Sequence, residues 1–177
     1  MARAGLSVVA TLGLGSNLGD RAALLQSAVA SLGAHGVEVR RVSPVYETAY
    51  LGPGSPQPAY LNAVAVVCSH CGPLELLQVL GQIETAHGRA PGTHGRPRRL
   101  DLDILYYGRC SVWHPRLVVP HPRLRERRFV LEPLADLGLL ADDETLVGQL
   151  ARLRQTQVVR RYGWLDPVGE RGEARVA

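Results

Sequence analysis

The order of strand-like and helix-like segments constrains the fold of this chain more than any other feature. Two segments with strand periodicity follow one another with no helix between them. Neighbouring parallel strands need a long crossover connection, so this junction favours antiparallel pairing and an α+β protein. In chain order the segments are a strand at Leu6–Leu14, a helix at Leu18–Leu32, strands at Val37–Tyr46 and Tyr60–Ser69, a helix at Pro73–His87 and a strand through Asp101 and Asp103.

This order is the split βαβ pattern of ferredoxin-like folds. It predicts a largely antiparallel four-stranded sheet with helices on its faces, followed by an extra C-terminal hairpin and helices. Ser16 and Asn17 end the first strand and are good N-cap residues for the first helix. A short strand at Ser111–His114 is expected to form a hairpin with the aspartate strand across Gly108. Later helical patterns cover Arg123–Arg127, Phe129–Leu137 and Thr145–Tyr162.

Length and cysteine usage predict one domain in a reducing compartment. A chain of 177 residues can bury a core without disulfides, and we expect a single domain over residues 1–165 and a polar, disordered tail over 166–177. No apolar run can cross a bilayer, and the start lacks the apolar stretch of a signal peptide. Three cysteines argue against a disulfide framework and favour a cytoplasmic protein. For the C-x-x-C pair of Cys68 and Cys71, redox chemistry and incidental thiols both stay open.

Two aspartates lie in an otherwise apolar strand. Because strand side chains alternate between faces, Asp101 and Asp103 share one face, roughly 7 Å apart, while Leu100, Leu102 and Ile104 share the other. Paired Mg²⁺ ions in phosphoryl transfer lie about 3.5–4 Å apart and are held by carboxylates, water and substrate oxygens. The pair therefore indicates a two-magnesium site, with a solvated face of an edge strand as the alternative.

All 20 basic residues of the chain are arginines. The absence of lysine excludes mechanisms that need one, including the Walker A loop and the protein-kinase strand lysine. Ten arginines fall between Arg89 and Arg128, against three acidic residues in that window. Because guanidinium groups bind phosphate oxygens bidentately, this concentration of positive charge predicts an anionic ligand; solvated surface arginines are the alternative.

Other classes of protein fit the sequence less well. A Rossmann domain is suggested by Gly13 and Gly15 after a strand, but Leu18 stands at the third glycine position and the later strands do not alternate with helices. A non-catalytic ferredoxin-like module that binds RNA or nucleotides would show exposed aromatic residues on its central strands. Tyr60 is the only such candidate on the third strand. A small-ligand regulatory domain would not require the two aspartates.

Four separated segments together resemble the 6-hydroxymethyl-7,8-dihydropterin pyrophosphokinase family. The similarity covers roughly residues 6–138. It implies an enzyme of tetrahydrofolate biosynthesis that transfers diphosphate from ATP to the hydroxymethyl group of the dihydropterin and releases AMP. The matching segments are Leu12-Gly13-Leu14-Gly15-Ser16-Asn17-Leu18-Gly19-Asp20, Thr48-Ala49-Tyr50-Leu51-Gly52-Pro53 with Tyr60-Leu61-Asn62, Pro97-Arg98-Arg99-Leu100-Asp101-Leu102-Asp103-Ile104, and Arg116-Leu117-Val118-Val119-Pro120-His121 with Arg127-Arg128-Phe129.

The resemblance also implies roles for individual residues. Asp101 and Asp103 would bind two Mg²⁺ ions, and Arg98 would join them as a catalytic residue that clamps phosphate. The ATP-binding residues would be Glu84, Arg89, Arg98, Ile104, Arg116, His121 and Arg127, with Ile104 packed against adenine. The pterin-binding residues would be Gly15, Thr48, Leu51, Tyr60, Asn62 and Phe129.

The chain departs from the family pattern at three positions. His94 and its neighbours stand where the family commonly has a Trp, Tyr50 stands where a Pro is usual, and Pro91 falls where a loop arginine often lies. His94 could replace the missing ring. The expected partners are the small molecules ATP and dihydropterin, with no nucleic acid and no membrane, and the protein is expected to be a monomer.

Overall fold

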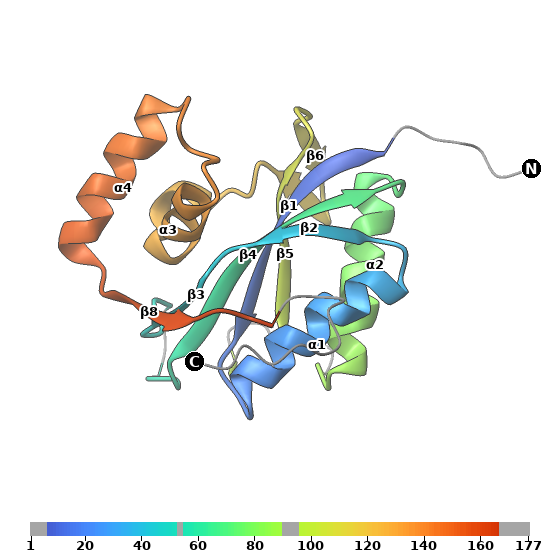
Figure 1. Ribbon diagram of the computed structural model, residues 1–177, viewed down its shortest axis with the longest axis horizontal. Helices are drawn as coiled ribbons and strands as arrows, with labels where there is room; N and C mark the ends of the chain where they lie inside the picture. Colours follow the sequence, from blue (N-terminus) through green and yellow to red (C-terminus); the bar gives the residue numbers. More distant parts are fainter. Residues whose placement is uncertain (1–6, 53–54, 90–95, 167–177) are drawn as a thin grey trace, which may run out of the picture.

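A computed structural model describes residues 7–52, 55–89 and 96–166. Its sheet has six strands in which all pairs are antiparallel (Figure 1). β1 lies between β5 and β4, and β4 pairs along its length with β2 and then β3. β8 extends the sheet at β3. The strand bounds are β1 Val8–Ser16, β2 Glu38–Val42, β3 Val45–Thr48, β4 Tyr60–Ser69, β5 Asp101–Tyr107 and β8 Val159–Gly163.

Helices cover both faces of the sheet. α1 (Arg21–Ala34) and α2 (Pro73–Ala86) pack on one face, and α3 (Arg128–Asp136) and α4 (Glu144–Thr156) lie on the other (Figure 1). A two-stranded hairpin, β6 (Val112–His114) and β7 (Leu117–Val119), and the short 3-10 helix η1 (Leu124–Glu126) connect β5 to α3. None of the helices among the described residues has the length and apolar character needed to span a membrane.

The alternation of side chains in β1, β4 and β5 divides the core into two clusters. Leu12 of β1, Leu61 of β4 and Ile104 of β5 belong to the cluster beneath α1 and α2. Val64 of β4 and Leu105 of β5 belong to the cluster that includes α3 and α4. Burial of these apolar side chains is the main source of stability, at about 25 cal/mol per Å² removed from water. Leu105 of β5 therefore faces α3, whereas Tyr107, beyond a register shift in the pairing with β1, belongs to the cluster beneath α1 and α2.

The α+β, ferredoxin-like class is confirmed, and the differences lie in the additions to its four-stranded core. The single strand expected at Val37–Tyr46 is broken into β2 and β3 at Ser43 and Pro44. Proline has no N–H for the ladder, and Ser43 supplies the missing links because its N–H donates to the Val64 carbonyl at 2.9 Å and its Oγ accepts from the Val64 N–H at 2.9 Å. The two halves can therefore pair with the same long strand.

Two predictions about the C-terminal half are wrong. Residues 159–163 form β8, not the end of a helix, because α4 ends at Thr156 and the following chain pairs with β3. The Ser111–His114 segment pairs with β7 and not with β5; only an isolated bridge joins Tyr107 to Cys110. A nearby strand offered a better antiparallel partner in each case, which local sequence could not indicate.

The start of the first helix differs from the prediction, and the expected tail lies almost wholly outside the described residues. Asp166, expected to begin a disordered tail, exchanges backbone hydrogen bonds with the Gln26 side chain of α1 at 2.8 and 3.1 Å. Residues 167–177, His94 and Pro91 lie outside the described residues. The first helix begins at Arg21, and its N-cap is Asp20, which accepts from the Ala23 N–H at 3.1 Å.

Glu132 of α3 connects the two C-terminal helices. Its side chain is 12% exposed and accepts hydrogen bonds from Arg128 of α3 at 2.8 Å and from Arg154 of α4 at 2.5 Å. Burial raises the pKa of Glu132, but the hydrogen bonds from Arg154 and Arg128 outweigh it and hold this pKa below its usual value. The charged form of Glu132 thus stabilises the folded protein.

Replacing Glu132 by Gln is expected to lower the free energy of unfolding by about 1–2 kcal/mol, since Arg154 is half exposed and solvent screens its share. A depressed pKa contributes stability above the unfolded-state pKa that is lost as pH falls through the folded-state value, so the difference from wild type should be full at pH 7 and shrink below pH 4. Urea unfolding of wild type and variant at pH 7 and below pH 4 measures this difference in the free energy of unfolding. Glu126→Gln is the control, because the Glu126 side chain is 64% exposed; equal losses in the two variants would contradict the argument.

Candidate active site

The cavity of this protein lies on the sheet face that α3 covers in part, and its volume is about 470 Å³. Its floor is β1, where Gly13 and Gly15 leave space because they carry no side chain. Gly15 pairs with Asn62 of β4 on one side and Asp101 of β5 on the other. Gly13 lies in the same way between Val64 and Asp103. Strands are about 4.8 Å apart, so side chains from β4 and β5 face each other across a gap near 10 Å wide.

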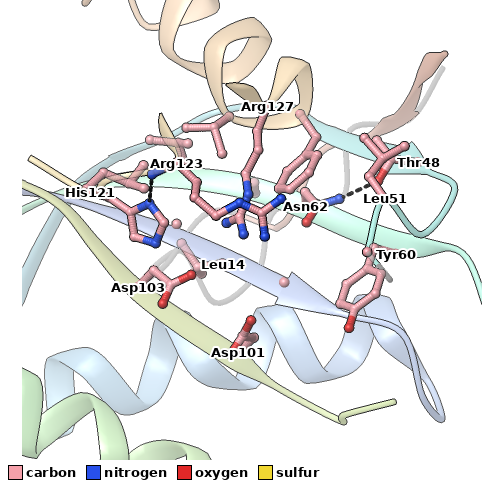
Figure 2. A pocket seen from close by; sticks show the side chains of 18 of the residues that line it. Leu14, Thr48, Leu51, Tyr60, Asn62, Asp101, Asp103, His121, Arg123 and Arg127 are labelled. Carbon is pink, nitrogen blue, oxygen red and sulfur yellow. Dashed lines mark hydrogen bonds between the residues drawn. The ribbon is translucent and has the colours of Figure 1, made fainter. Parts of the chain in front are cut away.

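The acidic side of the cavity is built by alternate residues of β5. Asp101 and Asp103 both line the cavity, while Leu102 and Ile104 point into the core beneath α1 and α2. The predicted common face of the two carboxylates is therefore what the structure shows (Figure 2). Asp101 Oδ1 accepts from Arg98 at 2.7 Å and from Arg89 at 3.3 Å.

The two carboxylates differ in electrostatic environment. Burial and then the charge of Asp101 raise the pKa of Asp103 to about 6, although Arg127 and Arg98 oppose the shift. Two nearby carboxylates, one of them buried and raised in pKa, suit a divalent cation because the cation removes their mutual repulsion. No group of three or more Asp, Glu, His or Cys side chains forms a metal cluster among residues 7–52, 55–89 and 96–166. Water and substrate oxygens would have to complete the coordination of any Mg²⁺ held here.

A basic wall faces the carboxylates. His121, Arg123 and Arg127 line the cavity, and Figure 2 shows the two arginine side chains extending from the helical side toward β5. Burial, followed by the charge of Arg123, lowers the pKa of Arg127, and burial with both arginines lowers the pKa of His121. A bound anion would reduce the repulsion between these positive charges, so this wall of the cavity is suited to binding phosphate. Arg123 was not predicted from sequence; its proximity to Arg127 comes from the turn through η1.

The part of the cavity next to the arginines is polar and aromatic, and Arg127 lies over the ring of Phe129 at 5.5 Å from its centroid. Asn62 and Thr48 are buried, and the Asn62 Nδ2 donates to the Thr48 Oγ1 at 2.9 Å (Figure 2). This bond sets the orientation of the amide, whose Oδ1 is directed toward Gly15: a Cβ at Gly15 would lie 3.3 Å from it. Tyr60, Leu51 and Phe129 line the same part of the cavity. All six residues expected on the pterin side thus meet in one place.

Three residues predicted to bind nucleotide do not line the cavity. The Ile104 side chain is buried beneath α1 and α2, on the face opposite Asp103, because strand residues alternate, and its contact with adenine stays a prediction. Arg116 lies exposed in the turn between β6 and β7. Glu84 is buried at 6% exposure and accepts hydrogen bonds from the Leu102 N–H at 2.8 Å and from Arg89. Glu84 therefore positions Arg89, which in turn contacts Asp101, and is not a solvated helix-end carboxylate.

Asn17 connects the two sides of the site. It is 1% exposed, and its Oδ1 accepts from the Arg98 N–H at 2.7 Å while its own N–H donates to the Arg98 carbonyl at 3.1 Å. Its Nδ2 donates to Gln57 at 3.2 Å and to the Pro58 carbonyl at 3.3 Å. The sequence suggested an N-cap here, but Asn17 instead holds the backbone beside the predicted phosphate clamp.

Acidic pairs that face clustered guanidinium groups are used by enzymes that move phosphoryl groups, because the charge of a polyphosphate must be neutralised and oriented. The aromatic part of the same cavity suits a flat acceptor. The fold and the site are therefore those expected of the phosphotransferase class. Within that class, the chain belongs to the 7,8-dihydro-6-hydroxymethylpterin-pyrophosphokinase (HPPK) family, whose model matches residues 11–138. The resemblance of the four segments is thereby confirmed.

Curated relatives agree with this assignment. A 2-amino-4-hydroxy-6-hydroxymethyldihydropteridine pyrophosphokinase of Bacillus subtilis is 43% identical over 130 residues, which is 73% of this chain and 77% of the relative. One from Methylorubrum extorquens is 41% identical over 154 residues, covering 85% of this chain and 97% of the relative. A mitochondrial folate synthesis bifunctional protein of Arabidopsis thaliana is 43% identical over 136 residues, covering 76% of this chain but 24% of the relative. The chain spans about a quarter of that longer protein.

Solved structures show the same fold. Plasmodium falciparum HPPK-DHPS crystallised with STZ-DHP superposes with a TM-score of 0.65 at 13% identity, over 89% of this chain and 46% of that one. The A437G form with pteroate gives a TM-score of 0.64, over 88% of this chain and 43% of the other. At such low identity the similarity concerns the fold alone.

Proposed function

We propose that this chain transfers diphosphate from ATP to the hydroxymethyl oxygen of 6-hydroxymethyl-7,8-dihydropterin and releases AMP, as a step of tetrahydrofolate biosynthesis. The observation that carries the proposal is the row formed by Asn62, Gly15 and Asp101 across three adjacent strands. This row supports the proposal because polar and aromatic side chains that could bind the acceptor lie beside an acidic pair within one cavity. An in-line transfer needs that adjacency, because acceptor oxygen and triphosphate must meet in one orientation.

On the nucleotide side, Asp101 and Asp103 would hold two Mg²⁺ ions, which supply neutralisation of the triphosphate charge when bound. Arg98, Arg89, His121 and Arg127 bind and orient phosphate oxygens. In the structure, Arg98 and Arg89 both contact Asp101. Since each guanidinium has five N–H donors, these side chains can contact phosphate without leaving the carboxylate entirely. The partial burial of Arg98, whose side chain is 11% exposed, strengthens its interaction with developing charge.

On the acceptor side, Asn62 presents an amide to the edge of the pterin ring, which needs both donors and acceptors. Thr48 keeps this amide in one orientation. Tyr60 and Phe129 contact the faces of the ring, and Gly15 allows it to approach the backbone. These residues exclude water from the hydroxymethyl group and hold it on the side of the cavity that faces Asp101.

A non-catalytic module that binds RNA is the second candidate, and the structure gives it little support. Single-stranded RNA stacks on aromatic residues of an open sheet face. Here α3 packs against β4, and Val64 and Leu105 are buried beneath α3 and α4. The carboxylates on β5 would also repel a phosphate backbone in the absence of metal.

The reaction products test the proposal. Incubation with ATP, Mg²⁺ and 6-hydroxymethyl-7,8-dihydropterin is expected to yield AMP and the diphosphate ester of the pterin in equal amounts. Anion-exchange chromatography of the products measures both. AMP formation should depend on the pterin. Formation of ADP would identify a single-phosphate kinase and overturn the proposal, as would AMP released equally without pterin.

We further propose that the protein acts as a monomer in the cytoplasm with no nucleic-acid partner. Cys68, Cys71 and Cys110 are all free thiols, as expected in a reducing compartment. Light scattering after gel filtration should give a molar mass near 19.2 kDa.

A further inference from the structure

Tyr50 is a further aromatic residue of the cavity, besides Tyr60 and Phe129. It lies two residues after the end of β3 and lines the cavity together with Thr48, Leu51 and Tyr60. Its ring is stacked with that of Tyr60, with centroids 6.4 Å apart and an angle of 24° between the planes. That separation is at the wide end of the range for aromatic pairs, about 4.5–7 Å.

Gly52 is the reason that Tyr50 can lie in this position. A Cβ built on Gly52 would overlap the phenol ring of Tyr50, and its distance to the ring atom Cε2 would be 2.7 Å. Gly52 does not have a positive φ, so an alanine there would meet the ring without backbone strain. The placement of Tyr50 over the cavity therefore depends on two neighbouring positions, which can be changed separately.

We propose that Tyr50 forms a wall of the acceptor pocket and contacts the face of the planar pterin ring, next to Tyr60. The inference rests on the proposed function and adds a residue that determines acceptor binding. Flat heteroaromatic rings gain affinity from stacking on aromatic side chains, and the gain is independent of the groups at their edge. Asn62 then forms hydrogen bonds with the edge of the ring, while Tyr50, Tyr60 and Phe129 contact its faces. We expect Tyr50 to affect pterin affinity more than nucleotide affinity, because its ring contact is with Tyr60, and it is Tyr60 that interacts with Arg98 and Asp101.

The experiment measures binding of 6-hydroxymethylpterin to the full chain by ligand fluorescence, and the kinetic constants for the dihydropterin and ATP. Tyr50→Leu is expected to weaken pterin binding by about tenfold to hundredfold, which is the effect of removing one stacking partner. KM for the dihydropterin should rise in proportion, with a smaller change in KM for ATP. Tyr50→Phe should retain binding within about threefold, because the ring carries the contact.

Gly52→Ala separates stacking from a general packing role. It leaves Tyr50 in the sequence but forces the outer end of its phenol ring to shift, so pterin binding should fall below that of wild type. Tyr162→Leu, at a tyrosine 55% exposed on β8, is the matched control and should bind like wild type. Unchanged binding in Tyr50→Leu, equal losses in Tyr50→Phe and Tyr50→Leu, or a parallel rise in both KM values would overturn the inference.

The outcome for the wild-type chain distinguishes this inference from the proposed function. If wild type neither binds the pterin nor forms AMP, the proposed function fails. If wild type does both and Tyr50→Leu is indistinguishable from it, only the role of Tyr50 fails.

Discussion

Replacing Asp101 or Asp103 by Asn is expected to lower kcat for AMP formation by about a thousandfold or more, the scale seen when a metal ligand or a main electrostatic contact of a transferring phosphoryl group is removed. Asparagine keeps the shape of each side chain but removes the charge that faces the basic wall. The measurement is single-turnover formation of AMP at saturating ATP and pterin. Asp142→Asn, at an exposed carboxylate in the turn before α4, is the control.

The Asp103 variant should also be more stable than wild type, which a merely structural residue would not show. The pKa of Asp103 rises from 3.8 to about 6 on folding, first through burial and then through Asp101. Between these two pH values Asp103 binds a proton in the folded protein but not in the unfolded chain. Ionisation of Asp103 therefore lowers the free energy of unfolding progressively as pH rises through this range. At pH 8 the penalty is complete, and Asp103→Asn should raise Tm by about 2–4 °C, as for roughly 1 kcal/mol in a domain of this size.

The pH dependence of that gain is the decisive part of the test. Below about pH 3, under both pKa values, Asp103 is neutral in the folded and the unfolded state, and the Asn variant should have the same Tm as wild type. A gain in Tm that is the same at pH 3 and pH 8 would show that charge is not its cause. Full activity in both Asn variants would remove the carboxylates from the reaction altogether.

Arg98→Ala is the second substitution with a large expected effect, a fall in kcat of about a hundredfold to a thousandfold. The Arg98 side chain is 11% exposed and donates to Asp101 at 2.7 Å, so it is held at the point where Asp101 meets the cavity. Burial opposes its charge, but Asp101 outweighs it and raises the pKa of Arg98. Arg98→Lys should recover only part of the rate, because an ammonium group cannot bind two oxygens in a fork.

The neighbouring residue provides a matched control for Arg98. Arg99 is exposed, is not among the described residues lining the cavity, and lies beside Gly88 instead. Arg99→Ala should change kcat by less than about threefold, as is usual for a surface side chain. Equal losses in the Arg98 and Arg99 variants would indicate a general effect of positive charge rather than a clamp on phosphate.

The ionic contacts around Asp101 indicate how nucleotide binding proceeds. Glu84 holds Arg89, and Arg89 with Arg98 contacts Asp101 in the ligand-free chain. A divalent cation must compete with these guanidinium groups for Asp101, whereas a triphosphate offers them new partners. Metal and nucleotide are therefore expected to bind more tightly together than separately.

Much of the site follows from local patterns in the chain. The period-2 alternation of β5 predicts that Asp101 and Asp103 share a face, and the structure confirms it. The order of the first six segments predicts the antiparallel core. The bounds of β4 and α2 follow closely from an apolar run and from a proline at the first helical turn. These features depend on residues within one or two turns of each other, where steric and burial preferences act directly.

The amino-acid sequence by itself indicated the core elements, the common face of the acidic pair, and the six residues, predicted to bind pterin, that line the same cavity. Only the tertiary structure decided that residues 159–163 join the sheet, that β6 pairs with β7, and that Arg123 and Tyr50 enter the cavity. The physical reason is that each of these outcomes is set by contacts between segments distant in the chain. A strand takes the free edge available to it, and an exposed side chain occupies whatever space the folded neighbours leave.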